Sequence, residues 1–120
     1  MSNYTIQAGQ NLIIKGTAID DDGSAVTLTS GYTFAAVVKR FKGTADASAL
    51  VDIDSTGDSA RFATSTNTVT CTVITSAESN GATPSRYYFD LWAIETATSQ
   101  EYKIDSGTVF IKDAATVAKS

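Results

Sequence analysis

The sequence predicts a single all-β domain built as a sandwich of two sheets. Threonine and serine make up about a quarter of the 120 residues. Threonine favours pleated, half-exposed strands, and both residues are mediocre in helices. About eight short segments of alternating hydrophobicity follow one another at roughly 8–12-residue spacing, with turn sequences between them. A chain of this length fits one domain, residues 1–120.

The first half of the chain predicts four strands, at residues 12–19, 25–28, 32–41 and 50–54. In the first strand, Leu12, Ile14 and Ala18 share one face. Ile13 and Ile19 share the opposite face. The expected core stripe of the third strand comprises Tyr32, Phe34, Ala36 and Val38. Residues 20–23 read Asp-Asp-Asp-Gly, a turn in which the glycine can take a positive φ.

The second half predicts a weak strand at 61–63, a strand at 69–73, a helical turn at 75–80 and strands at 86–94, 101–104 and 108–112. Thr75 or Ser76, with Glu78 nearby, has the pattern of a helix cap. Residues 105–107 read as the turn of a final hairpin. The strand at 86–94 is the strongest, because aromatic and aliphatic residues occupy both of its faces.

Composition excludes several classes of function. Nine basic residues against thirteen acids give a formal charge of −4, whereas a nucleic-acid surface needs clustered Lys and Arg. The absence of histidine excludes a Ser-His-Asp triad and the commonest metal ligand. No segment approaches the ~20 apolar residues of a membrane span, and the N-terminus shows no signal-peptide pattern. We therefore expect no nucleic acid, membrane, metal or cofactor as partner, and synthesis in the cytoplasm.

Residues that invite a chemical role have simpler structural explanations. Asp52 and Asp54 share one strand face, which suits either a solvated surface or, as a minor alternative, a small hydrolase. Residues 20–23 lack the alternating oxygen ligands of a calcium loop, so a tight turn is expected, with weak calcium binding left open. Cys71 lies mid-strand between two valines and is expected to be a buried apolar residue.

A single basic cluster, residues 39–42, lies at the end of a predicted strand. Its sequence is Lys-Arg-Phe-Lys, too few charges for a nucleic-acid face. It is compatible with ordinary surface charge or with a salt-sensitive contact to an acidic protein.

The strand at 86–94 carries the candidate site. If Tyr87, Phe89 and Leu91 face the core, its other face presents a row of two aromatic side chains and a carboxylate: Tyr88, Asp90 and Trp92. Outward aromatic residues can anchor a protein interface or stack on sugar rings. The alternative is that a loop or the second sheet covers Trp92. We take these three residues as the candidate interface.

Three stretches of the second half resemble Ig-like domains of tailed-phage virion proteins. They are Val69–Ser79, Ser85–Ala93 and Tyr102–Ile111. The shared pattern is a strand, a short helical turn with Ala and Glu, a Tyr-Tyr-Phe-Asp-Leu strand and a hairpin ending in Ser-Gly-Thr-Val. The resemblance covers Thr68 to Lys112 and is nearest to the N-terminal domain of phage baseplate upper proteins, whose members continue into coiled-coil or receptor-binding regions.

The resemblance implies an Ig-like antiparallel β-sandwich of about 7–9 strands and a non-enzymatic role as a virion structural protein. Such a protein would be a capsid decoration, neck, tail or baseplate component. Its partners would be other virion proteins or further copies of itself in a symmetric assembly. Residues 113–120 are expected to form a flexible or partner-bound tail. The alternative function is a carbohydrate-binding module that uses Tyr88 and Trp92.

Overall fold

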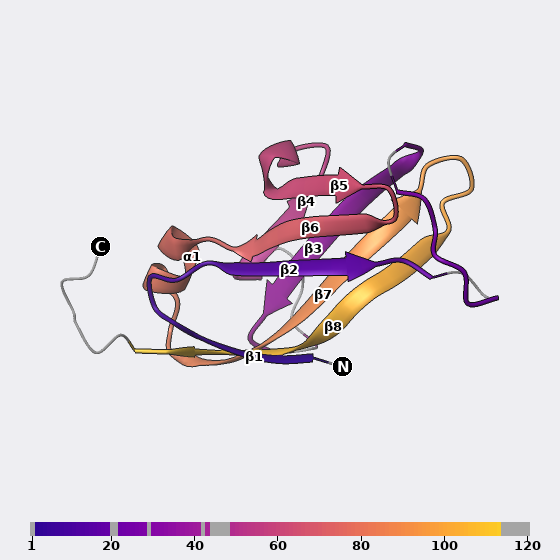
Figure 1. Cartoon of the computed structure of the whole chain (residues 1–120). Coiled ribbons are helices and arrows are strands. Elements are labelled where there is room, and N and C mark those ends of the chain that lie inside the picture. The colour runs from indigo at the N-terminus through magenta and orange to yellow at the C-terminus, as the bar shows by residue number, and fades with distance from the viewer. Residues whose placement is uncertain (1, 20–21, 29, 42, 44–48, 114–120) are drawn as a thin grey trace.

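The computed structural model describes residues 2–19, 22–28, 30–41, 43 and 49–113, and within them the chain forms eight strands in two facing sheets (Figure 1). The five-stranded sheet has the order β1 (Ser2–Gln7), β8 (Glu101–Lys112), β7 (Ser85–Glu95), β3 (Tyr32–Lys39) and β4 (Val51–Asp54). The three-stranded sheet has the order β2 (Leu12–Thr17), β6 (Thr68–Ile74) and β5 (Phe62–Ser65). All paired strands are antiparallel except β1 and β8, which run parallel.

This strand order is that of an Ig-like sandwich. The central strands β3, β7 and β8 lie in one sheet and β2, β6 and β5 in the other, and β4 extends the first sheet as in variable-type domains. Tyr87, at the start of β7, donates from its hydroxyl to the carbonyl of Thr83 at 2.8 Å. That contact is the tyrosine corner typical of this fold. The predicted all-β, Ig-like sandwich of 7–9 strands is confirmed.

The core lies between the sheets and follows the alternation read from the sequence. On β2, Leu12 and Ile14 are buried while Ile13 is 56% exposed. The predicted stripe of β3 is buried at Phe34, Ala36 and Val38. The inward residues of the other strands are also buried; they are Val51, Ile53, Val69, Cys71, Val73, Tyr87, Phe89, Leu91, Val109 and Ile111.

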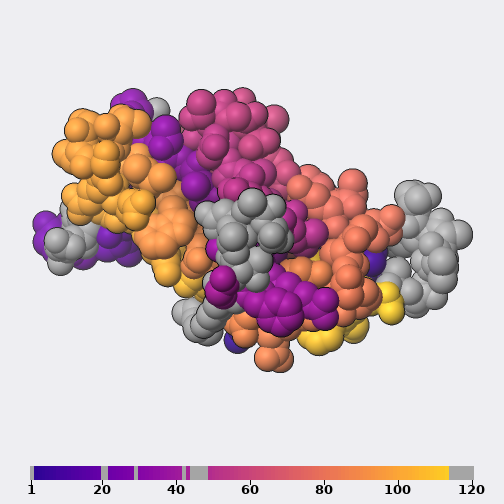
Figure 2. Space-filling model, turned by 180° about the vertical axis from the view of Figure 1, so that it is seen from behind, coloured from indigo at the N-terminus to yellow at the C-terminus, as the bar shows by residue number. Residues whose placement is uncertain are grey.

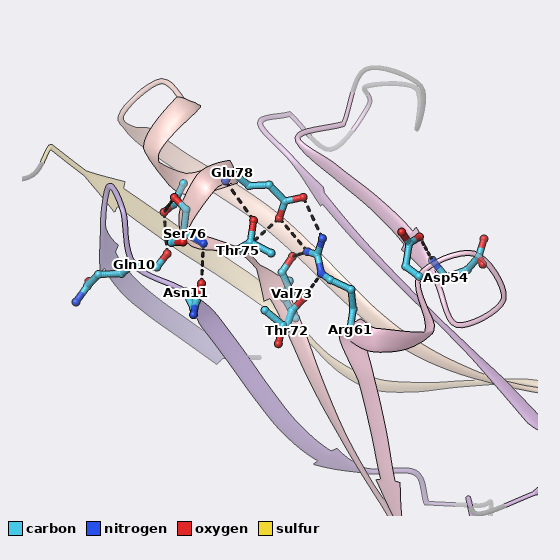
Figure 3. Close-up of polar contacts among 11 residues, drawn as sticks. Gln10, Asn11, Asp54, Arg61, Thr72, Val73, Thr75, Ser76 and Glu78 are labelled. Atoms are coloured by element: carbon cyan, nitrogen blue, oxygen red, sulfur yellow. Dashed lines mark hydrogen bonds and ion pairs between the residues drawn. The ribbon is translucent and has the colours of Figure 1, made fainter. Parts of the chain in front are cut away.

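The predicted helical turn is α1 (Ser76–Gly81), and its cap is anchored to the sheet (Figure 3). Thr75 and Glu78 form a capping box, each side chain accepting from the other's backbone N–H at 3.2 and 2.9 Å. Arg61, which ends the 3-10 turn η2 (Ser59–Arg61), donates to both carboxylate oxygens of Glu78 at 3.1 and 2.9 Å. Its guanidinium also donates to the carbonyls of Thr72 and Val73, so it joins α1 to β6.

The expected hairpin at 105–107 is wrong. Residues 101–112 form one continuous strand, β8, which pairs with β7 along its length. The register shifts between Leu91 and Trp92, opposite Asp105 and Lys103, so the irregularity is a bulge and not a turn. Gly107 is needed for another reason: a Cβ there would lie 1.8 Å from the carbonyl oxygen of Ser2 on β1.

Two further differences concern the N-terminal half. β1 was not predicted. It is a parallel edge strand that can lie against β8 because Gly107 has no side chain. The expected strand at 25–28 is reduced to one bridge between Ile19 and Ala25. Gly23 does take a positive φ, 87°, whereas Asp20 and Asp21 lie outside the described residues, as does the predicted tail from 114 onward.

Candidate interaction surface

The candidate residues lie on the side of the five-stranded sheet that faces away from the core, which we call the outer face. Along β7, Tyr87, Phe89 and Leu91 are buried, while the alternate side chains are partly buried or, at Arg86, exposed. The partly buried residues include Tyr88, Asp90 and Trp92, as the alternation predicted. Figure 2 shows the molecule from this side, opposite to the three-stranded sheet that lies in front in Figure 1.

The strand register gives each candidate its neighbours across the sheet. Trp92 lies between Ala35 on β3 and Lys103 on β8. Asp90, one step along, lies between Val37 and Ser106. Tyr88 lies between Lys39 and Thr108. The sheet thus brings the three candidates together in a row, with Ala35, Val37 and Lys39 beside them on β3 and polar residues beside them on β8.

Lys103 connects two of the three candidates. Its ammonium lies 3.4 Å from Asp90 Oδ1 and 4.8 Å from the centroid of the Trp92 ring. The lysine and the aspartate side chains are each 46% exposed, so this pair contributes little to folding stability. It does hold a positive charge over one face of the indole, an arrangement favoured by the ring quadrupole.

Charges on the outer face are segregated along the strand direction. One end of the outer face begins at the row of Tyr88 and extends toward the C-terminus of β8. Its outward positions carry three basic residues: Lys39, Arg86 and Lys112. The opposite end of the face begins at the row of Asp90 and extends toward the N-terminus of β8. Its outward positions carry four acids and one lysine: Asp52, Asp54, Asp90, Glu101 and Lys103. We call these the basic half and the acidic half. Among the described outward positions, the basic half holds no carboxylate.

Of the paired aspartates Asp52 and Asp54, Asp54 has a structural role in the turn that follows β4. Asp54 accepts from the backbone N–H of Gly57 at 2.7 Å, and Asp58 accepts from that of Asp54 at 3.3 Å. These contacts close the turn after β4, as an Asx-type turn does. Over the described parts of the chain, no group of three or more Cys, Asp or Glu residues is placed to hold a metal ion.

Cys71 is fully buried between the sheets. Burial raises the pKa of its thiol to about 12, and the charge of Arg61, which acts to lower the pKa, has the smaller effect. Since the thiolate is the nucleophile, this cysteine is inert in the folded domain.

Several residues of this surface were not identified from the sequence. Phe110 is 43% exposed on the outer face of β8. Lys103 was not singled out, because the bulge in β8 sets which residue lies beside Trp92. The alternation within 108–112 is enough to place Phe110 on the outer face, since its neighbours Val109 and Ile111 point into the core.

No protein-family model and no curated protein matches this chain. One solved structure with a similar course of the backbone is that of murine CRIg, with 10% sequence identity and a TM-score of 0.35. The match covers 93% of this chain and 92% of that one. So distant a likeness carries no weight here, and the fold assignment rests on the strand order. In the described residues, no helix is long and apolar enough to cross a membrane.

Proposed function

We propose that this chain is a non-enzymatic structural protein of a tailed-phage virion that acts through protein contacts made by its outer face. The resemblance of Thr68 to Lys112 to virion Ig-like domains supports the class of protein. The Ig-like sandwich is compatible with it, since such domains commonly serve as interaction modules on cell and particle surfaces.

The observation that carries the proposal is the side-by-side placement of Tyr88, Asp90 and Trp92 on the outer face. Val37 and Ala35 lie next to them on β3, so the centre of the face combines aromatic, aliphatic and charged groups. Trp and Tyr in this setting are the residue types that dominate protein interfaces. A sheet face that only contacts water would carry polar residues at these positions.

The test is incorporation of Trp92→Ala into particles, in competition with the wild-type chain. Hot-spot tryptophans contribute 2 kcal/mol or more, so incorporation should fall at least about tenfold. Ile13→Ala is the control, because Ile13 is an outward apolar residue, 56% exposed, that belongs to the three-stranded sheet. Circular dichroism checks that both variants are folded. Normal incorporation of folded Trp92→Ala would rule this surface out.

The carbohydrate-binding alternative has weaker support. One face of the Trp92 ring already carries the Lys103 ammonium at 4.8 Å, so a sugar stacking there would first have to displace it. Trp92 is the only tryptophan of the chain, so intrinsic fluorescence reports on this face alone. We expect no saturable change with any glycan; a saturable change would favour the module.

A further inference from the structure

We infer that the partner of the outer face is a second copy of this chain, packed face to face across a two-fold axis that runs perpendicular to the strands. This inference rests on the proposed function, because it names the partner of the same surface. Three observations carry it: the segregation of charge along the strands, the groups that the register places at the centre of the face, and the area of the face.

The charge pattern is self-complementary under only one orientation. A two-fold axis parallel to the strands would place the basic half of one copy on the basic half of the other. An axis perpendicular to the strands places basic on acidic at both ends of the contact. Two-fold contacts use the same patch on both copies, and opposed like charges cost several kcal/mol. The perpendicular axis is therefore selected.

The register also places complementary groups opposite one another. The centre of the charge pattern lies between the sheet rows of Tyr88 and Asp90. An axis through that point brings Tyr88 of one copy over Asp90 of the other, a phenol facing a carboxylate. Trp92 then lies opposite Arg86 of the second copy, and a guanidinium group can stack on an indole ring.

The area of the face fits a specific contact. Each outward residue covers about 32 Å², from a two-residue repeat of about 6.7 Å and a strand spacing of about 4.8 Å. Roughly twenty residues face outward, so the face measures about 600 Å² per copy. Two copies then bury about 1,200 Å², the lower end of the range for stable interfaces.

The inference is tested by reversing charge on each half and then mixing the variants. One variant combines Asp52→Lys with Glu101→Lys, and the other combines Arg86→Glu with Lys112→Glu; all four residues are exposed. In sedimentation velocity, the wild type should form dimers that weaken with added salt. Each variant alone should self-associate at least tenfold more weakly, because like charges then face each other. An equimolar mixture should regain wild-type affinity as a heterodimer.

Lys15→Glu is the control, since Lys15 is exposed on the three-stranded sheet and should leave the dimer unchanged. Recovery in the mixture also shows that both reversed variants are folded. A monomeric wild type at all concentrations, undiminished association of either variant, or a mixture that stays monomeric would each overturn the inference.

The dimer and the proposed function fail separately. A monomeric domain whose Trp92→Ala variant is lost from particles would remove the dimer and keep the virion role. If the chain forms the dimer described but is absent from particles, the dimer stands and the virion role is removed.

Discussion

Gly107 is the residue on which the N-terminal edge of the five-stranded sheet depends. Its φ is 156°, and any Cβ would lie 1.8 Å from the Ser2 carbonyl oxygen of the paired strand. Because the obstacle is backbone, a small rearrangement of a side chain cannot relieve it. β1 can therefore lie against β8 only if this position has no side chain.

Gly107→Ala should displace β1 and lower the free energy of unfolding by at least about 2 kcal/mol. Thermal unfolding followed by circular dichroism measures this as a fall in Tm of roughly 5 °C or more. Gly81→Ala is the matched control, because a Cβ at Gly81 would meet nothing within 4 Å beyond its chain neighbours and its own helix. Equal Tm values for the two variants would contradict the close approach of β1.

Cys71 should be protected from thiol reagents in the folded state. Burial raises its pKa to about 12, so hardly any thiolate is present at pH 8, and the side chain is inaccessible. We expect native labelling at least about a hundredfold slower than labelling in denaturant. Rapid native labelling would show that the two sheets open readily around β6.

Glu78 should make stability depend on acid pH. Burial acts to raise its pKa, but hydrogen bonds from Arg61 and the Thr75 backbone, with the charge of Arg61, outweigh this and hold the pKa below its usual value. A carboxyl with a lowered folded pKa adds stability above its unfolded pKa, and that stability is lost as the pH falls through the folded pKa.

Glu78→Gln should therefore cost about 1 kcal/mol at pH 7, and the difference from wild type should shrink below about pH 4.5. Gln preserves the capping geometry and removes the charge. Urea unfolding at a series of pH values measures the difference. A difference that stays constant down to pH 3 would mean that the ion pair with Arg61 does not stabilise the fold.

At the level of elements, local sequence patterns were enough to predict features that depend on a single strand or a single turn. The alternation of β7 separates buried Phe89 from outward Asp90, and the Thr-Ser-Ala-Glu sequence is enough to predict the capped helix α1. These signals depend only on residues within a few positions of one another.

Local sequence patterns gave wrong predictions where the structure of a segment depends on pairing with a distant part of the chain. Asp-Ser-Gly at 105–107 has the composition of a turn, yet this glycine serves the approach of β1 from the other end of the chain. β1 itself is largely polar, because only its inward residues, such as Ile6, reach the core. A parallel edge strand of this kind has no hairpin signal to reveal it.

The candidate interface was likewise predicted only in part. Period-two alternation is enough to place Tyr88, Asp90 and Trp92 on one face. Placing Lys103 beside Trp92 requires the register of β8, which the bulge shifts by one residue. The division into basic and acidic halves depends on the register of all five strands, so no single segment contains it.

At the scale of the whole molecule, the formal charge of −4 conceals this division. Net charge alone gives no orientation of approach between two proteins, whereas segregated charges on one face select one. At physiological salt, charges separated by more than about 8 Å are largely screened, but charges in contact across a packed interface still interact. A face whose two ends carry opposite charges is self-complementary under a two-fold axis that exchanges those ends.

The proposed function requires this chain to be a structural component of a virion. Quantitative mass spectrometry of purified particles, with this chain counted against the major shell protein, tests it most directly. We expect a fixed ratio: close to that of the shell protein for a capsid decoration, or a small fraction of it for a neck, tail or baseplate part. Absence of the chain from purified particles would contradict the claim.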